Sequence, residues 1–284
     1  MSLRFAFARG MSIATKIAEA VTGTRVGFRI LIFHDVTPDV RPAFEDLVAH
    51  LAGRGALLTP DAAARWIAGD GPKAAAPSPP CLLTFDDGFA GNYELAASVL
   101  AKHGAKAVFF VCPGLVDLGA DAQLAAVRAN VFSRAVTDAA ALARLRLMNW
   151  TEIGDLVAAG HAIGAHGMTH RALSSLSGED LRREILESGA RIEAEISRPV
   201  EWYAYAFGGI EHISAAALEI IAGRYPLCRS GIRGLNRAGA NRLALLADHV
   251  DLLAPPAYQR LTAEGALDIA YLGRRRRYLA MCPK

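Results

Sequence analysis

Short apolar runs alternate with longer amphipathic segments along most of the chain. Because these runs are too short for helices, we predict β-strands at 28–36, 81–85, 106–112, 161–166, 200–207 and 225–231, with a further strand or strand end at 242–250. The segments between them have helical spacing, and several end at glycine, which predicts helices at 44–55, 61–70, 92–103, 149–160, 177–197 and 212–222. Such alternation predicts an α/β protein with a parallel sheet, either open or closed into a barrel.

Polar residues at the ends of the predicted strands favour the barrel. In α/β barrels the carboxyl ends of the strands converge on one mouth, where active sites lie. Six residues with polar side chains stand at or just after such ends, from five strands: His34, Asp86, Asp87, His166, Tyr205 and His249.

The remaining segments are predicted to be peripheral. Residues 119–147 are rich in Ala, Leu and Arg and predict a helical insertion, while the proline-rich stretch 71–80 predicts a surface connection. The N-terminal 23 residues predict an amphipathic helix rather than a signal peptide, because Arg9 and Lys16 interrupt the apolar run. We expect one domain over 1–284, with a core of about 29–250 and a basic C-terminal tail containing 274–277.

Composition excludes some classes of function. The net charge of +3 is too small, and the arginines too scattered, to indicate nucleic-acid binding. No apolar run reaches the ~18 residues of a membrane span. The four cysteines form no CxxC pair, which predicts buried, reduced thiols and a cytoplasmic location, with peripheral contact at the inner membrane as an alternative.

Two histidines and two aspartates form the candidate chemistry. His166 and His170 are four residues apart, so they can share one face of a turn and chelate a metal, although a bare pair at this spacing is also common on surfaces. Asp86 and Asp87 in "TFDDG" can be an ordinary turn. Together, two imidazoles and one carboxylate would form a three-ligand metal site, and the second carboxylate would serve as a general base.

The pair "TFDDG" (84–88) and "HGMTH" (166–170) resembles the polysaccharide deacetylase family, also called the NodB-homology domain or carbohydrate esterase family 4. The resemblance covers roughly 29–250. It implies an irregular (β/α) barrel of about seven strands and removal of N-acetyl groups from N-acetylglucosamine-type sugars. It also implies that Asp86 is the general base and that Asp87, His166 and His170 bind a divalent metal. Zinc suits these mixed ligands best, with cobalt, nickel, iron and manganese as alternatives.

Three further stretches resemble motifs of this family. "ILIFHDV" resembles the opening strand of exopolysaccharide-type members and makes His34 a substrate-binding candidate; "LLADHV" implies that His249 is the general acid. "WYAYAFGG" resembles the third motif and makes Tyr205 a substrate-binding candidate. This motif departs from the family pattern, because Ala206 replaces a proline and no arginine stands where one normally orients the base. The Asp-Trp motif of peptidoglycan-type members is absent.

The expected activity is therefore deacetylation of amino sugars in an exopolysaccharide or its lipid-linked precursor. The expected partner is an N-acetylated oligo- or polysaccharide, with peripheral contact to membrane-bound polysaccharide machinery as an additional hypothesis. Two alternatives remain: a hydrolase of another C–N bond, such as a deformylase or cyclic amidase, and an inactive glycan-binding homologue.

Overall fold

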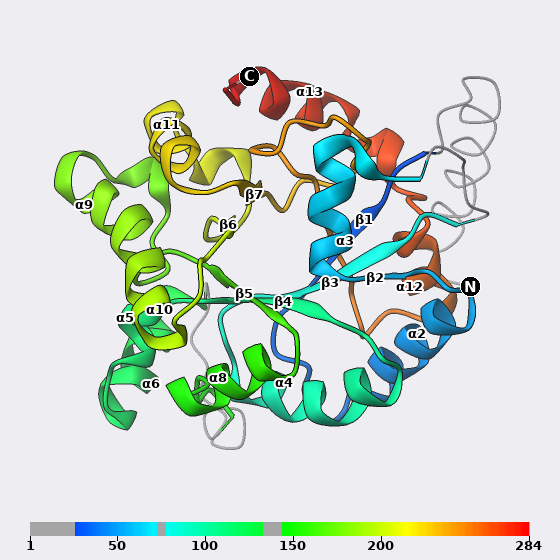
Figure 1. Cartoon of the computed structure of the whole chain (residues 1–284), viewed down its shortest axis with the longest axis horizontal. Coiled ribbons are helices and arrows are strands. Elements are labelled where there is room, and N and C mark those ends of the chain that lie inside the picture. The colour runs from blue at the N-terminus through cyan, green and yellow to red at the C-terminus, as the bar shows by residue number, and fades with distance from the viewer. Residues whose placement is uncertain (1–25, 73–77, 133–143, 284) are drawn as a thin grey trace.

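The strands of the computed structural model form one parallel sheet (Figure 1). The structure describes residues 26–72, 78–132 and 144–283, so the predicted N-terminal helix and part of the predicted insertion lie outside the described residues. The strand order is β7-β6-β5-β4-β3-β1-β8, and the short strand β2 pairs with β3. The strands are β1 (Arg29–Phe33), β2 (Leu57–Leu58), β3 (Cys81–Phe85), β4 (Ala107–Val111), β5 (Ala162–Ala165), β6 (Trp202–Ala204), β7 (Leu227–Arg229) and β8 (Asp248–His249).

The segment 242–249 joins the two edges of this sheet. Leu245 forms a parallel bridge to Arg229 of β7, and β8 pairs with β1 at the other edge. The sheet therefore curls into an irregular α/β barrel, as predicted. The predicted strand at 242–250 is regular only over β8, because the residues before it pair with β7 through isolated bonds rather than a continuous ladder.

Alternation along the strands creates two apolar layers. Residues at one parity, such as Ile30, Leu82 and Phe110, fill the inside of the barrel, and Trp66 packs with them against Phe28. Residues at the other parity form the larger core beneath the helices. Because successive side chains of a strand point to opposite faces, the parity of a residue decides whether it can reach the barrel mouth.

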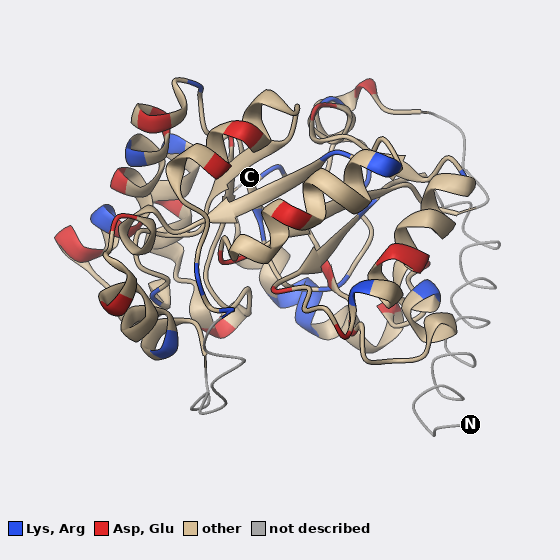
Figure 2. Cartoon of the chain, turned by 90° about the horizontal axis from the view of Figure 1, so that it is seen from below, with Lys and Arg blue, Asp and Glu red and all other residues tan. Residues whose placement is uncertain are grey.

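The helices surround the sheet, and charged residues of both signs are interspersed on them (Figures 1 and 2). The α-helices are α2 (Arg41–Gly53), α3 (Pro60–Arg65), α4 (Ala90–Leu95), α5 (Pro113–Val116), α6 (Ala120–Asn130), α8 (Trp150–Ala158), α9 (Gly178–Arg182), α10 (Ser188–Ile196), α11 (Ala215–Arg224), α12 (Pro256–Ala263) and α13 (Leu272–Met281). The π-helical segments η1 (Trp66–Asp70), η2 (Ala96–Leu100) and η4 (Arg183–Glu187) continue α3, α4 and α9, while η3 (Leu173–Ser175), η5 (Ile210–His212) and η6 (Asp268–Tyr271) are short 3₁₀ turns.

Two peripheral expectations can be compared with these elements. The described part of the insertion contains α6, whose Val127 packs in a small separate core with Phe89 and Leu147. The C-terminal arginines do not form a free tail: they lie in α13, which is anchored by buried Tyr278.

All four cysteines are buried and unpaired, as expected. Among the described residues, no helix combines the length and apolar character needed to cross a membrane.

Candidate active site and metal centre

The carboxyl ends of the strands enclose a cavity of about 270 Å³ at the barrel mouth. Alternation of side chains along the strands explains most of its lining. Residues two positions apart on a strand point to the same face, so Asp86 follows inward-facing Thr84 and His34 follows inward-facing Ile32. The lining residues are Ile32, His34, Asp86, Asp87, Val131, His166, His170, Phe207, Gly208, Arg229, Gly231 and His249. Six of the seven predicted site residues therefore meet in one place.

Asp87, His166 and His170 direct three ligand atoms at one point. Oδ1 of Asp87 lies 3.5 Å from Nε2 of His166 and 3.2 Å from Nε2 of His170. These atoms all lie within 4.8 Å of one another, and all three residues are buried. The spacing suits ligands of a single ion.

Hydrogen bonds on the far side of each imidazole orient these ligands. Nδ1 of His166 donates to the carbonyl of Ala204 at 2.7 Å, and Nδ1 of His170 donates to the carbonyl of Asn130 at 2.9 Å. With the proton on Nδ1, each neutral ring turns a lone pair at Nε2 toward Asp87. Oδ1 of Asp87 is buried without a hydrogen-bond partner among the described residues. A buried carboxylate oxygen facing two imidazole lone pairs is a donor set that fits a divalent metal.

The backbone around these ligands is held in a sparsely populated conformation. Asp87 and His170 have positive φ angles of 71° and 63°, in the left-handed region that L-residues seldom adopt. Buried Glu184 of η4 accepts hydrogen bonds from the backbone N–H groups of Met168, at 2.8 Å, and Thr169, at 3.1 Å. Glu184 therefore fixes the turn that carries both histidines. Sequence reasoning missed this residue, whose only signal is a carboxylate within an otherwise amphipathic helix.

Arg229 supplies the arginine that the third motif lacks. It lies at the end of β7, forms an ion pair with Oδ1 of Asp86, and stacks over the ring of Phe110 at 4.7 Å. Burial alone would raise the pKa of Asp86, but Arg229, with a further contribution from His166, holds this pKa below its usual value. Asp86 is thus an oriented, ionised carboxylate. The sequence could have indicated that Arg229 points into the barrel. It lies two positions after Leu227 on β7, and residues two positions apart on a strand point to the same face.

His34 and His249 form the opposite wall of the cavity. Their ring centroids are 5.5 Å apart, and both side chains are accessible to solvent. Partial burial, together with the neighbouring Arg233 guanidinium, lowers the pKa of His249 to about 4. The imidazole is therefore neutral near pH 7 and would act as an acid only after receiving a proton.

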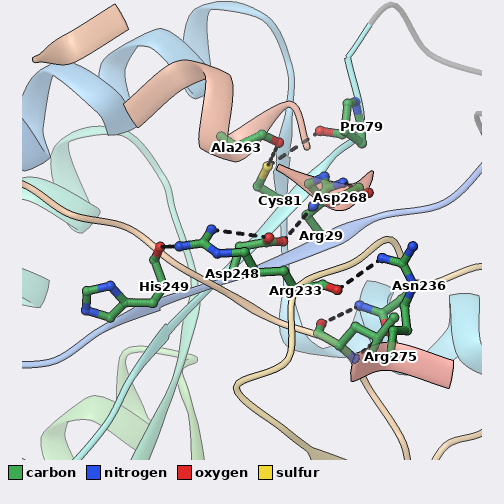
Figure 3. A network of polar contacts seen from close by, with 11 residues as sticks. Arg29, Pro79, Cys81, Arg233, Asn236, Asp248, His249, Ala263, Asp268 and Arg275 are labelled. Atoms are coloured by element: carbon green, nitrogen blue, oxygen red, sulfur yellow. Dashed lines mark hydrogen bonds and ion pairs between the residues drawn. The ribbon is translucent and has the colours of Figure 1, made fainter. Parts of the chain in front are cut away.

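A polar network under the barrel wall holds the backbone of His249 (Figure 3). Nη2 of Arg233 donates to the carbonyl oxygen of His249 at 2.7 Å. The neighbouring carboxylate of Asp248 accepts from the buried guanidinium of Arg29 at 2.6 Å, and Arg29 also pairs with Asp268 at 2.5 Å. This network ties β8 to β1 and to the start of the C-terminal helices.

Tyr205 does not reach the cavity, which corrects its prediction as a substrate-binding residue. Parity places it beside Tyr203 on the helix-facing side, where it is buried and its hydroxyl donates to the carbonyl of Gly208 at 3.0 Å. This bond closes the turn that the missing proline would otherwise restrict. Gly208 must be glycine, since a Cβ there would lie 2.6 Å from the backbone nitrogen of Gly231. Phe207, with φ of 63°, lines the cavity instead.

The fold and the convergent site together define an α/β barrel whose mouth holds a candidate Asp-His-His metal site beside an arginine-paired carboxylate. The family model for polysaccharide deacetylase matches residues 73–222, just over half of the chain. The chain therefore belongs to the polysaccharide deacetylase family. A comparison with curated protein sequences finds no match.

Several solved structures share this fold. The deacetylase PplD of Streptococcus pyogenes, solved with acetate, is 20% identical with a TM-score of 0.66, covering 85% of this chain and 99% of PplD. IcaB from Ammonifex degensii is 21% identical with a TM-score of 0.63, covering 85% of this chain and 97% of IcaB. The deacetylase domain of BpsB from Bordetella bronchiseptica is 18% identical with a TM-score of 0.62, covering 80% of this chain and 96% of the BpsB domain.

Proposed function

We propose that the protein is a metal-dependent deacetylase that hydrolyses N-acetyl groups of amino sugars in an exopolysaccharide or its lipid-linked precursor. The observation that carries this proposal is the convergence of three metal-ligand atoms beside a carboxylate tethered by an arginine. Asp87, His166 and His170 would hold the ion. A divalent cation bound there would polarise the acetyl carbonyl and lower the pKa of water. Zinc suits one oxygen and two nitrogen ligands, and cobalt, nickel, iron and manganese are the alternatives.

The residues of the chain account for the proton transfers. Asp86, kept ionised by Arg229, accepts a proton as the oxygen of water adds to the acetyl carbon. His249 or His34, once it has taken up a proton, then donates it to the amide nitrogen as the C–N bond breaks. The products are acetate and an amine on the sugar. Acetate is also the molecule bound in the structure of PplD.

The ion pair between Arg229 and Asp86 argues against the alternative of an inactive glycan-binding homologue. The altered third motif was the one sequence feature that favoured an inactive homologue, because no arginine was assigned to orient the base. Arg229 fills that role from another strand. The observations therefore favour an active enzyme.

Acetate release tests the proposed activity. The metal-loaded enzyme should release acetate from an N-acetylglucosamine oligomer, and Asp86→Asn should lose about 10²–10⁴-fold in rate while keeping its metal. The asparagine oxygen can still accept from Arg229, so the fold should persist. Undiminished turnover in Asp86→Asn would remove this residue from the mechanism. Hydrolysis of a formamide or cyclic amide, with no acetate released from sugars, would favour the other C–N bond.

We also infer peripheral contact between helix α13 and an anionic membrane surface. Ile269 of η6 and Leu272 and Leu279 of α13 are exposed and spaced by three and seven residues, so they lie on one face. Arg276 and Arg277 are exposed beside them and make no hydrogen bond or ion pair within the described ranges. Apolar side chains flanked by arginines are typical of helices that lie on lipid headgroups. The cytoplasmic location stays a prediction.

Vesicle flotation tests this contact. The protein should float with phosphatidylglycerol vesicles and not with phosphatidylcholine vesicles, and the double variant Arg276→Glu/Arg277→Glu should lose the binding. Arg182→Glu on α9 serves as the matched control. Equal flotation of wild type and the double variant would show that α13 is not the contact.

A further inference from the structure

A second cavity opens next to the candidate active site. It has a volume of about 240 Å³ and lies between the loop after β1 and the loop after β8. His34 and His249 line both this cavity and the active-site cavity, so the two cavities adjoin at the histidine pair. An extended molecule seated at the metal centre would meet the second cavity beyond these rings.

An exposed leucine forms the outer edge of the second cavity. Leu253 is 81% exposed, and Phe207 at the first cavity is 48% exposed; these are the two most exposed large apolar side chains among the residues the structure describes. Exposed apolar groups that gather around one cleft indicate a binding surface, because water is displaced from them when a ligand binds.

The loop that carries Leu253 is built to hold it outward. The backbone N–H of Leu253 donates to Oδ1 of Asp251 at 3.0 Å, which closes an Asx-type turn. Nε2 of buried Gln259 in α12 donates to the carbonyls on either side, at 3.1 Å to Leu252 and 2.8 Å to Ala254. The exposure of Leu253 is thus a property of an ordered turn.

The lining of the second cavity matches the two faces of a sugar ring. Val36, Val40 and Val250 are buried and supply an apolar floor for C–H groups. The cavity is also lined by three aspartates whose carboxylates can accept hydrogen bonds from hydroxyl or ammonium groups: Asp35, Asp39 and Asp251. No Lys or Arg is among the described lining residues, so a neutral or cationic ring fits better than an anionic one.

We propose that this cavity is a subsite for one neutral or cationic pyranose unit adjacent to the unit being deacetylated in the same chain. The proposal rests on the proposed deacetylase function and extends it to recognition of substrate length. Each cavity is smaller than the roughly 300–1,000 Å³ of sites for drug-sized ligands, so each holds about one ring. The acetylated unit occupies the metal side, the histidine pair lies at the linkage, and Leu253 covers the neighbouring ring.

Chain-length dependence of turnover tests the subsite. With metal-loaded enzyme, kcat/KM for acetate release should be at least tenfold higher for the N-acetylglucosamine pentamer than for the monomer. Leu253→Ala should lower the value for the pentamer by about five- to tenfold and leave the monomer unchanged, because only the pentamer reaches the second cavity. Leu118→Ala, which truncates an exposed leucine between α5 and α6, should change neither. Equal values for both substrates in wild type, or equal losses on both in Leu253→Ala, would overturn the proposal.

Binding measurements separate this proposal from the proposed function. Calorimetry with metal-free protein should show tighter binding of the pentamer than of the monomer, and Leu253→Ala should abolish the difference. That result without acetate release would support the subsite and reject the deacetylase. Acetate release without any length-dependent binding would support the deacetylase and reject the subsite. A disaccharide with glucosamine beside the acetylated unit should also bind better than one with glucuronic acid, and equal binding would refute the assigned charge preference.

Discussion

Replacing Arg229 by methionine should move the pH dependence of the enzyme rather than simply abolish activity. Arg229 and Asp86 form a buried ion pair, with side chains only 1% and 6% exposed. In Arg229→Met the carboxylate stays buried but loses its partner. Burial, which by itself raises the pKa of Asp86, would then act against only weaker opposing charges.

The size of the shift follows from the energetics of buried pairs. Removing one partner of a buried pair costs about 3–5 kcal/mol, and one pKa unit corresponds to about 1.4 kcal/mol. Because Asp86 lines an open cavity, solvent screens part of this cost, but the pKa of Asp86 should still rise. Its proton is then lost only at higher pH. The acid limb of the kcat/KM profile should move upward by the same amount.

Acetate release measured between pH 5 and pH 10 checks this reasoning. Activity of Arg229→Met should be reduced most at the acid end and recover partly toward pH 9, while Arg229→Lys should restore much of the profile near neutrality. Arg224→Met, which removes a partly exposed arginine paired with Glu193 on the outer helices, is the matched control. A loss of the same factor at every pH would refute the electrostatic role and leave Arg229 a purely structural residue.

Three further predictions concern the histidines. His166→Ala and His170→Ala should each lower the metal content from about one ion per chain to near zero in elemental analysis, and full occupancy would show that the ligands are misassigned. His249→Ala and His34→Ala should retain the metal, and the one that donates the proton should lose about 10²–10⁴-fold in kcat; full activity in both would exclude the pair as acids. Burial lowers the pKa of His161 to about 4, so the unfolded chain binds its proton near pH 6.5 and the folded protein only near pH 4. The free energy of unfolding should therefore fall by about 2–3 kcal/mol between these pH values, and His161→Asn, which keeps an acceptor for the N–H of Ala107, should show a flatter pH dependence in denaturant titrations.

Local pattern was enough to predict the sheet and the cluster of carboxylate and imidazole side chains at its mouth. Apolar runs and their spacing predicted seven of the strands, because a strand buried on both faces must be apolar along its length. The two motifs predicted which carboxylate and imidazoles lie at the mouth, since a parallel barrel brings every strand end to one side. The strand or strand end predicted at 242–250 is a regular strand only over β8.

Only the tertiary structure decided which distant side chains act together. Arg229 lies 143 positions from Asp86 and is one of many arginines in the sequence, so its pairing depends on the closure of the barrel through 242–249. Glu184 likewise became significant only when η4 was packed against the turn at Met168. Tyr205 was misassigned because motif position was weighed above strand parity, which turns it toward the helices. Long-range pairing and the inward or outward direction of a side chain are set by packing, and no local pattern encodes the packing partner.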